Sequence, residues 1–168
     1  MNVRDVILDQ LQWTRQTTLS TFAEFDVGQR FFQAAPGLNH PLWLLGHIAA
    51  SEDHLVLGYC QGRSLLPPEY GKLFGMKSTP LSDPAAYPSA EEMLETLARV
   101  HQAAGDYLRS ATDDELALPP VGFDQMPDRA RQLFSTRLRC AWFHANHEAM
   151  HNGQLGYIRR LLGKPYRV

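Results

Sequence analysis

Four stretches of the chain carry apolar residues at alternating spacings of three and four positions, and Pro and Gly residues lie between them. This spacing puts apolar side chains on one face of an α-helix, whereas a half-buried strand requires strict alternation. It predicts helices at residues 3–25, 41–59 and 89–110, and a last helix that begins between 127 and 135 and ends at 162. Four long helices with little strand signal predict an all-α protein folded as a helical bundle.

Capping residues support these helix boundaries. Asn39 or His40 can cap the second helix, because Pro41 suits the first helical position. Ser89 and Glu92 have the spacing of a capping box at the start of the third helix. Gly and Pro residues after position 162 stop the fourth helix.

Residues 61–88 differ from the rest of the chain, because Pro and Gly recur through them and no periodicity is sustained. They predict a long loop between the second and third helices. A loop of this length in a compact domain more often forms or covers a binding site than merely connects two helices. Its candidate contact residues are Tyr70, Lys72, Phe74 and Lys77.

The composition is that of a single globular domain over residues 1–168, with 44% hydrophobic and 20% charged residues. A net charge of −2 offers no basic face, so we expect no nucleic-acid partner. No apolar run is long enough for a membrane span, and the N-terminal residues lack the apolar core of a signal peptide. We therefore expect a cytoplasmic protein that does not bind membranes.

The chain has two cysteines, Cys60 and Cys140, and both lie in apolar-periodic stretches. Sparse cysteines without short spacing do not indicate a disulfide framework or a thiolate metal site. We expect both to be buried free thiols rather than nucleophiles.

The last predicted helix carries a row of histidines. His144, His147 and His151 fall within roughly 60° of one another on a helix that turns about 100° per residue. His147 and His151 are one turn apart, which is the separation at which two side chains of one helix can bind the same metal ion. Histidines at this spacing also occur on ordinary solvated helix faces, so a second source of ligands has to be identified.

His47 is the candidate third ligand, because it interrupts an apolar stretch of the second helix. A buried imidazole without a partner costs roughly 1–3 kcal/mol, and a metal ion would satisfy it. The alternative is a hydrogen-bonded core histidine. His40 and His54 lie seven residues before and after His47 and so share its helix face. Together with His144, they are candidates for a fourth ligand or for groups that contact the ligands from outside the metal site. His101 is predicted to be a surface residue.

Two motifs carry a resemblance to a known family. His47 lies in Gly-His-Ile-Ala-Ala-Ser-Glu, and His147-Glu-Ala-Met-His151-Asn-Gly-Gln154 follows 100 residues later. Together they resemble the DinB/YfiT-like superfamily, and the resemblance covers nearly the whole chain. It implies a DinB-like four-helix bundle of the up-up-down-down type, a homodimer, and a divalent metal ion bound by His47, His147 and His151.

Characterised relatives in that superfamily are thiol enzymes, including bacillithiol S-transferases and a mycothiol-dependent maleylpyruvate isomerase. The resemblance therefore implies a metal-dependent S-transferase or isomerase that uses a low-molecular-weight thiol and a small-molecule substrate under the 61–88 loop. Candidate residues for orienting ligands or water are Asn39, Glu148, Gln154 and Tyr157. The residue types do not distinguish zinc, nickel and iron.

Two other functions remain open. A metal-dependent hydrolase would need a carboxylate base near the metal-bound water, and Glu52 and Glu148 lie off the predicted histidine faces. A non-catalytic, dimerising metal-binding module would have no open coordination position. A pocket carboxylate that reaches the metal-bound water would favour the hydrolase, whereas positive and polar groups in the pocket would favour a cofactor thiol.

Overall fold

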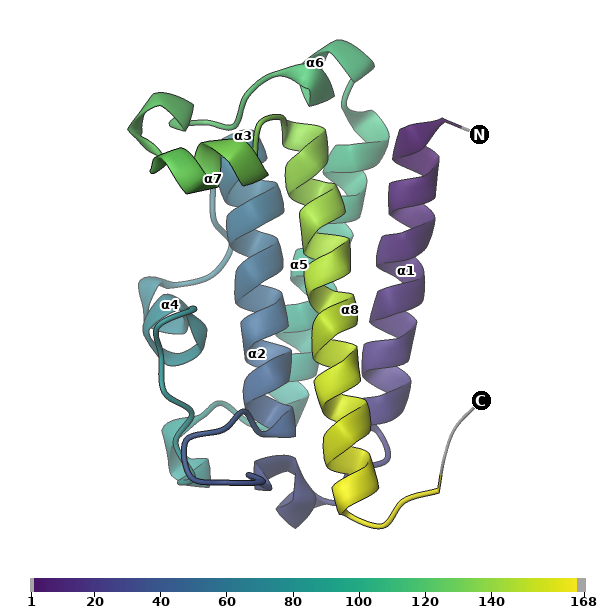
Figure 1. The fold of residues 1–168 in the computed structure, drawn as a ribbon, viewed down its shortest axis with the longest axis vertical. Helices are drawn as coiled ribbons and strands as arrows, with labels where there is room; N and C mark the ends of the chain where they lie inside the picture. Colours follow the sequence, from purple (N-terminus) through teal and green to yellow (C-terminus); the bar gives the residue numbers. More distant parts are fainter. Residues whose placement is uncertain (1, 166–168) are drawn as a thin grey trace.

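The computed structural model describes residues 2–165, and its long helices run side by side along the longest axis (Figure 1). These bundle helices are α1 (Val3–Phe22), α2 (Pro41–Glu52), α5 (Ala90–Ser110) and α8 (Arg137–Leu161). No strand occurs among residues 2–165. The predicted all-α helical bundle is therefore confirmed.

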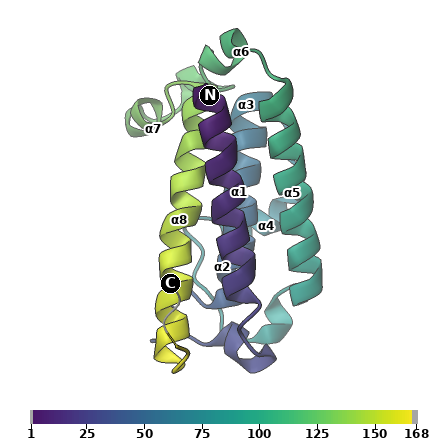
Figure 2. The ribbon, with the colours of Figure 1, turned by 90° about the vertical axis from the view of Figure 1, so that its right-hand side faces the viewer.

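The directions of the four helices differ from the up-up-down-down order. Contacts between α1 and α8 join residues whose numbers rise together, from Arg15 with Glu148 to Glu24 with Arg159, so these helices run parallel. Helices α2 and α5 both run the opposite way (Figures 1 and 2). The topology is up-down-down-up, because residues 62–89 return along the length of the bundle and α5 starts at the same end as α2.

The second bundle helix is capped by His40, whose Nδ1 accepts a hydrogen bond from the Trp43 amide at 3.1 Å. After Glu52 the chain does not continue as one α-helix to residue 59. A π-helical segment, η2 (Asp53–Gly58), and a short helix, α3 (Tyr59–Gln61), follow instead. Apolar spacing alone did not distinguish this change, since a π-turn leaves a helix helical in appearance.

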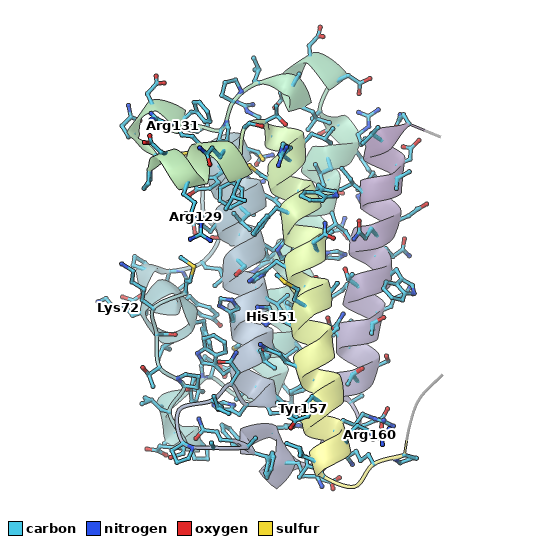
Figure 3. The ribbon with its side chains drawn as sticks, viewed as in Figure 1. Lys72, Arg129, Arg131, His151, Tyr157 and Arg160 are labelled. Carbon is cyan, nitrogen blue, oxygen red and sulfur yellow. The ribbon has the colours of Figure 1, made fainter. Side chains whose placement is uncertain are left out.

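Residues 61–88 are not one irregular loop. They contain α4 (Pro68–Phe74) and η3 (Pro84–Ala86), which lie outside α2 in Figure 1. The ring of Phe74 is fully buried in the core, so its predicted role as a contact residue of the loop is wrong. Lys72 and Lys77 are exposed, and Figure 3 shows Lys72 on the side of α4 away from the bundle.

The remaining connections close the two ends of the bundle. One 3-10 turn, η1 (Val27–Phe31), lies between α1 and α2. Between α5 and α8 the chain forms α6 (Asp113–Ala117), η4 (Phe123–Gln125) and α7 (Asp128–Leu133) at the end where α1 begins (Figure 2). Within the described part of the chain, no helix is long and apolar enough to cross a membrane.

The core consists of two apolar clusters stacked along the bundle. One lies toward the start of α1 and includes Ile7, Leu55, Val100 and both cysteines, which are buried and free as expected. The other lies toward the end of α1 and includes Phe22, Leu44, Phe74, Leu97 and Leu155. Each bundle helix passes from one cluster to the other through buried or half-buried charged or imidazole side chains: Arg15, Glu52, His101, His144 and Glu148. We call these five residues the charged layer.

Gly46 allows α4 to approach α2 closely. A Cβ atom at this position would lie 2.4 Å from the ring of Phe74 and 2.6 Å from the Met93 methyl group. We predict that Gly46→Ala lowers the free energy of unfolding by about 1–3 kcal/mol, because an overpacked core must shift its side chains or backbone. Urea unfolding followed by circular dichroism measures the change.

Gly153→Ala is the matched control, since Gly153 also lies within a bundle helix but has no neighbouring atom within 4 Å of the new Cβ. It should be neutral or stabilising by up to about 1 kcal/mol, the difference in helix propensity between the two residues. Equal effects of the two substitutions would show that the approach of Phe74 does not restrict this position.

Candidate metal centre

The structure brings the three predicted ligands together. His47 on α2 faces His147 and His151 on α8, and the Nε2 atom of His147 lies 3.2 Å from Nε2 of His47 and 3.0 Å from Nε2 of His151. The possible ligand atoms of the three residues all lie within 4.8 Å of one another. Figure 3 shows His151 near the middle of the bundle. No other such cluster of His, Cys, Asp or Glu side chains occurs among residues 2–165.

Hydrogen bonds of the Nδ1 atoms of two of the histidines determine where the lone pairs of their Nε2 atoms point. Nδ1 of His47 donates to the Phe74 carbonyl at 2.6 Å, and Nδ1 of His151 donates to Oε1 of Gln154 at 3.0 Å. Asn39 Nδ2 donates to the same Gln154 oxygen at 3.1 Å. Since an oxygen acceptor on Nδ1 leaves the proton there, both Nε2 atoms present lone pairs to the centre of the cluster.

This arrangement fits a cation better than it fits the three histidines alone. Nε2 of His147 can donate a proton to Nε2 of only one of the other two histidines. No proton then lies between it and Nε2 of the other, although the two distances are about the same. Nδ1 of His147 is buried and has no hydrogen-bond partner among residues 2–165. Three convergent imidazole nitrogens are the donor set of many zinc, nickel and iron sites, so the residues present fit a divalent metal ion.

The histidines of the cluster are held in the neutral form that metal binding requires. Burial, together with the neighbouring imidazoles, lowers the pKa of His47 to about 4 and that of His147 to about 3. Burial also lowers the pKa of His151. At neutral pH all three rings therefore keep a free lone pair and do not repel a cation.

Aromatic side chains hold the rings in place. The indole of Trp43 stacks on His47 with centroids 4.7 Å apart and planes inclined by 10°, and Trp43 Nε1 donates to the Leu73 carbonyl at 2.9 Å. Phe143 lies alongside His147 with its ring inclined by 18°. The imidazoles thus have little freedom to turn away from one another.

The cluster opens into a pocket of about 450 Å³ between α2, α8 and the segment after α4. None of the described residues that line it is an Asp, Glu, Lys or Arg. Besides the three histidines, its wall consists of neutral polar and apolar residues: Gly37, Asn39, Trp43, Met76, Ser78, Thr79, Pro80, Met150 and Gln154. Met76 and Met150 are largely exposed, while the Ser78 hydroxyl is buried and has no hydrogen-bond partner.

Several predicted site residues lie elsewhere. His40 is committed elsewhere, because its Nδ1 caps α2 and its Nε2 donates to the Leu81 carbonyl at 3.1 Å. His54 is exposed beside Tyr59. Tyr157 is 64% exposed and does not line the pocket, and Figure 3 places it farther along α8 than His151.

The two glutamates are buried but do not reach the pocket. Glu52 and Glu148 both bind Arg15 of α1, a residue that the sequence analysis missed. His101 is not a simple surface residue, because its Nδ1 lies 2.8 Å from Oε1 of Glu52. His144 is fully buried, with Nε2 3.8 Å from Glu52 and 3.7 Å from Glu148. A signal for Arg15 was present in the sequence, since it falls on the apolar stripe of the first helix.

The comparisons with known proteins agree with the fold. The sequence pattern of the DinB superfamily matches residues 10–155. The chain belongs to the DinB superfamily. Its structure is similar to that of a conserved protein from Enterococcus faecalis, with a TM-score of 0.72, 20% identity, and coverage of 98% of this chain and 99% of the other. That likeness concerns the fold alone. No significant match was found among curated proteins.

The lowered pKa values predict how acid affects the metal-free protein. An unfolded imidazole titrates near 6.5, whereas His47 and His147 titrate at about 4 and about 3 when folded. Between these values the unfolded chain binds more protons, so the free energy of unfolding falls as the pH falls from about 6.5 to about 4. Urea unfolding at a series of pH values measures the slope.

His147→Gln identifies the contribution of the cluster to that slope. It removes one titrating group and relieves the other two, so its free energy of unfolding should depend less steeply on pH than that of wild type over the same range. Identical slopes for the two proteins would contradict the predicted pKa of His147.

Proposed function

We propose that this DinB superfamily protein binds a divalent metal ion through His47, His147 and His151 and uses it in a thiol-dependent S-transferase or isomerase reaction. The observation that carries the proposal is the convergence of three neutral Nε2 atoms at the base of a pocket. Three protein ligands leave a coordination position free for a further group, as is common in catalytic rather than structural sites.

A bound divalent metal would act as a Lewis acid and lower the pKa of a thiol so that the thiolate is available near neutral pH. The chain's own residues supply the remainder of the site. Gln154 and Asn39 hold the ring of His151 in place. Ser78 lies in the pocket wall, and its buried hydroxyl has no hydrogen-bond partner among the described residues.

The described lining of the pocket offers the polar groups expected beside a cofactor thiol but not the positive ones, and its lack of a carboxylate counts against the hydrolase. A hydrolase of the kind considered needs a carboxylate base beside the metal, whereas no described lining residue is acidic. Glu52 and Glu148 are bound to Arg15. Exposed Met76 and Met150 offer polarisable apolar contacts at the pocket, which suit an uncharged electrophile.

The metal content of tag-free protein, measured by elemental mass spectrometry, tests the first part of the proposal. We predict about one equivalent of zinc, nickel or iron in wild type and its loss in His47→Ala and His151→Ala. His54→Ala is the matched control, since this exposed histidine follows α2 but lies outside the cluster. Wild type that stays free of metal after reloading would refute the site.

Thiol binding is tested on protein loaded with cobalt(II), in which a bound thiolate produces a charge-transfer absorption band. We predict that β-mercaptoethanol produces this band and that mercaptosuccinate, whose carboxylates find no Lys or Arg in the described lining, does so only at higher concentration. Metal binding without a band for either thiol would contradict the thiol reaction and leave the metal site intact.

A small-molecule substrate, a homodimeric assembly and a cytoplasmic location remain predictions of the sequence analysis. They are compatible with the proposed reaction, and none of the arguments for the metal site depends on them.

A further inference from the structure

The charged layer contains one arginine that contacts three other helices. Arg15 of α1 donates through Nε to Oε1 of Glu148 at 2.8 Å and through Nη2 to Oε2 of Glu148 at 3.1 Å. Nη2 also donates to Oε2 of Glu52 at 2.8 Å, and Nη1 donates to the Leu97 carbonyl of α5 at 3.1 Å. The guanidinium is thus bonded to α2, α5 and α8 at once.

These contacts lie beside the candidate metal centre. Glu148 is the residue after His147, and Glu52 lies five residues after His47, about 7.5 Å along the axis of a helix with a rise of about 1.5 Å per residue. Arg15 therefore links the two helices that carry the three histidines. Each of its carboxylate partners lies close in the chain to one of the proposed ligands.

A second contact with α1 follows the other histidine of α8. Asn152 is the residue after His151, and its Nδ2 donates to the Thr14 carbonyl at 2.9 Å. Thr18 Oγ1 lies 2.6 Å from Oε1 of Glu148 and donates to it. The face of α8 that lies next to the histidine pair is thus bonded to α1 at two successive turns.

Stability alone is a poor explanation for burying these charges. Arg15 is 4% exposed and both carboxylates are 0% exposed. Replacing a buried ion pair by apolar residues of similar volume is often neutral or stabilising, because desolvation offsets the attraction. What a forked guanidinium adds is directional geometry, since it fixes where its two carboxylate partners can lie.

We propose that Arg15 is a positioning residue that sets the separation and rotation of α2 relative to α8, and through them the spacing of the Nε2 atoms of His47, His147 and His151. This inference rests on the proposed metal-dependent function. Arg15 does not touch the pocket and acts only through Glu52 and Glu148.

The charged layer is not a second metal site. The positive guanidinium already occupies the space between the two carboxylates. Among residues 2–165, the only group of three potential ligands within bonding range of a common ion is His47, His147 and His151.

The chain offers a matched control. Arg159 of α8 donates through Nε to Oε2 of Glu24 at 2.6 Å, and Arg159 is 6% exposed. This is a second, partly buried Arg–Glu contact between α8 and the chain at the end of α1. It lies eight residues beyond His151, about 12 Å along the helix. Substituting Arg159 removes a comparable ion pair without removing a link between α2 and α8.

The experiment compares Arg15→Lys, the triple substitution Arg15→Met with Glu52→Gln and Glu148→Gln, and Arg159→Gln with wild type. Lysine keeps the charge but loses the fork, and the triple variant keeps side-chain size without leaving an unpaired carboxylate. Zinc affinity is measured by competition with a chelating indicator, and site geometry by the visible absorption spectrum of the cobalt(II) protein.

We expect both Arg15 variants to bind zinc about 10–100-fold more weakly, the range found when groups that orient metal ligands are removed. Their cobalt spectra should also change. Arg159→Gln should keep the wild-type affinity within about twofold and the same spectrum, even if its stability falls. If the triple variant fails to fold, Arg15→Lys alone decides the comparison.

Folded Arg15 variants with wild-type affinity and spectrum would overturn the positioning role and leave the metal site standing. Wild type that binds no metal would refute the proposed function instead. In that case imidazole nitrogen NMR shifts of the metal-free proteins still test the spacing. Changes at His47, His147 and His151 in Arg15→Lys but not in Arg159→Gln support the role of Arg15, and their absence contradicts it.

Discussion

The pairing of buried charges in the charged layer, between the two apolar clusters, determines how the four helices can pack. Burial opposes the charge on Arg15 and on Glu52, yet the carboxylates raise the pKa of Arg15 above its ordinary value, and Arg15 holds the pKa of Glu52 well below its usual range. Removing one partner would leave an uncompensated buried charge, at a cost of about 3–5 kcal/mol. The apolar clusters on either side fix the helices more loosely, since apolar contacts are not directional.

The candidate metal centre lies between the charged layer and a less regular segment that forms one wall of the pocket. The segment after α3 supplies the wall, and Phe74 attaches it to the bundle. Its ring is buried against Gly46, and its carbonyl accepts the Nδ1 proton of His47. One residue thus contributes to the core and also orients a proposed ligand. The pocket opens between this segment and α8, so the side of the histidine cluster that ligands can reach is built from Met76, Ser78 and Met150.

Membership of the DinB superfamily accounts for the helical architecture, but a fold does not determine a reaction. The local chemistry of the pocket is more informative. Its described wall contains no acidic or basic side chain other than histidine, and the buried glutamates face away from it. The missing carboxylate disfavours a hydrolase that depends on a carboxylate base, which leaves the thiol reaction as the better-supported proposal, although the described wall lacks the positive groups expected beside a cofactor thiol.

The sequence by itself determined the helical class, because the apolar spacing of each bundle helix is a local property that survives without tertiary contacts. It also determined the histidine pair, since residues 147 and 151 share a face on any α-helix, and it identified His47 as a polar interruption of an apolar stretch. Only the tertiary structure decided the direction of each helix, the contact of His40 with the Leu81 carbonyl, and the burial of Glu52 and Glu148. Those outcomes depend on contacts between residues far apart in the chain, above all on Arg15, whose partners lie 37 and 133 positions away. Helical periodicity reports which face of a helix is buried, but it carries no information about which buried charge on another helix will meet it.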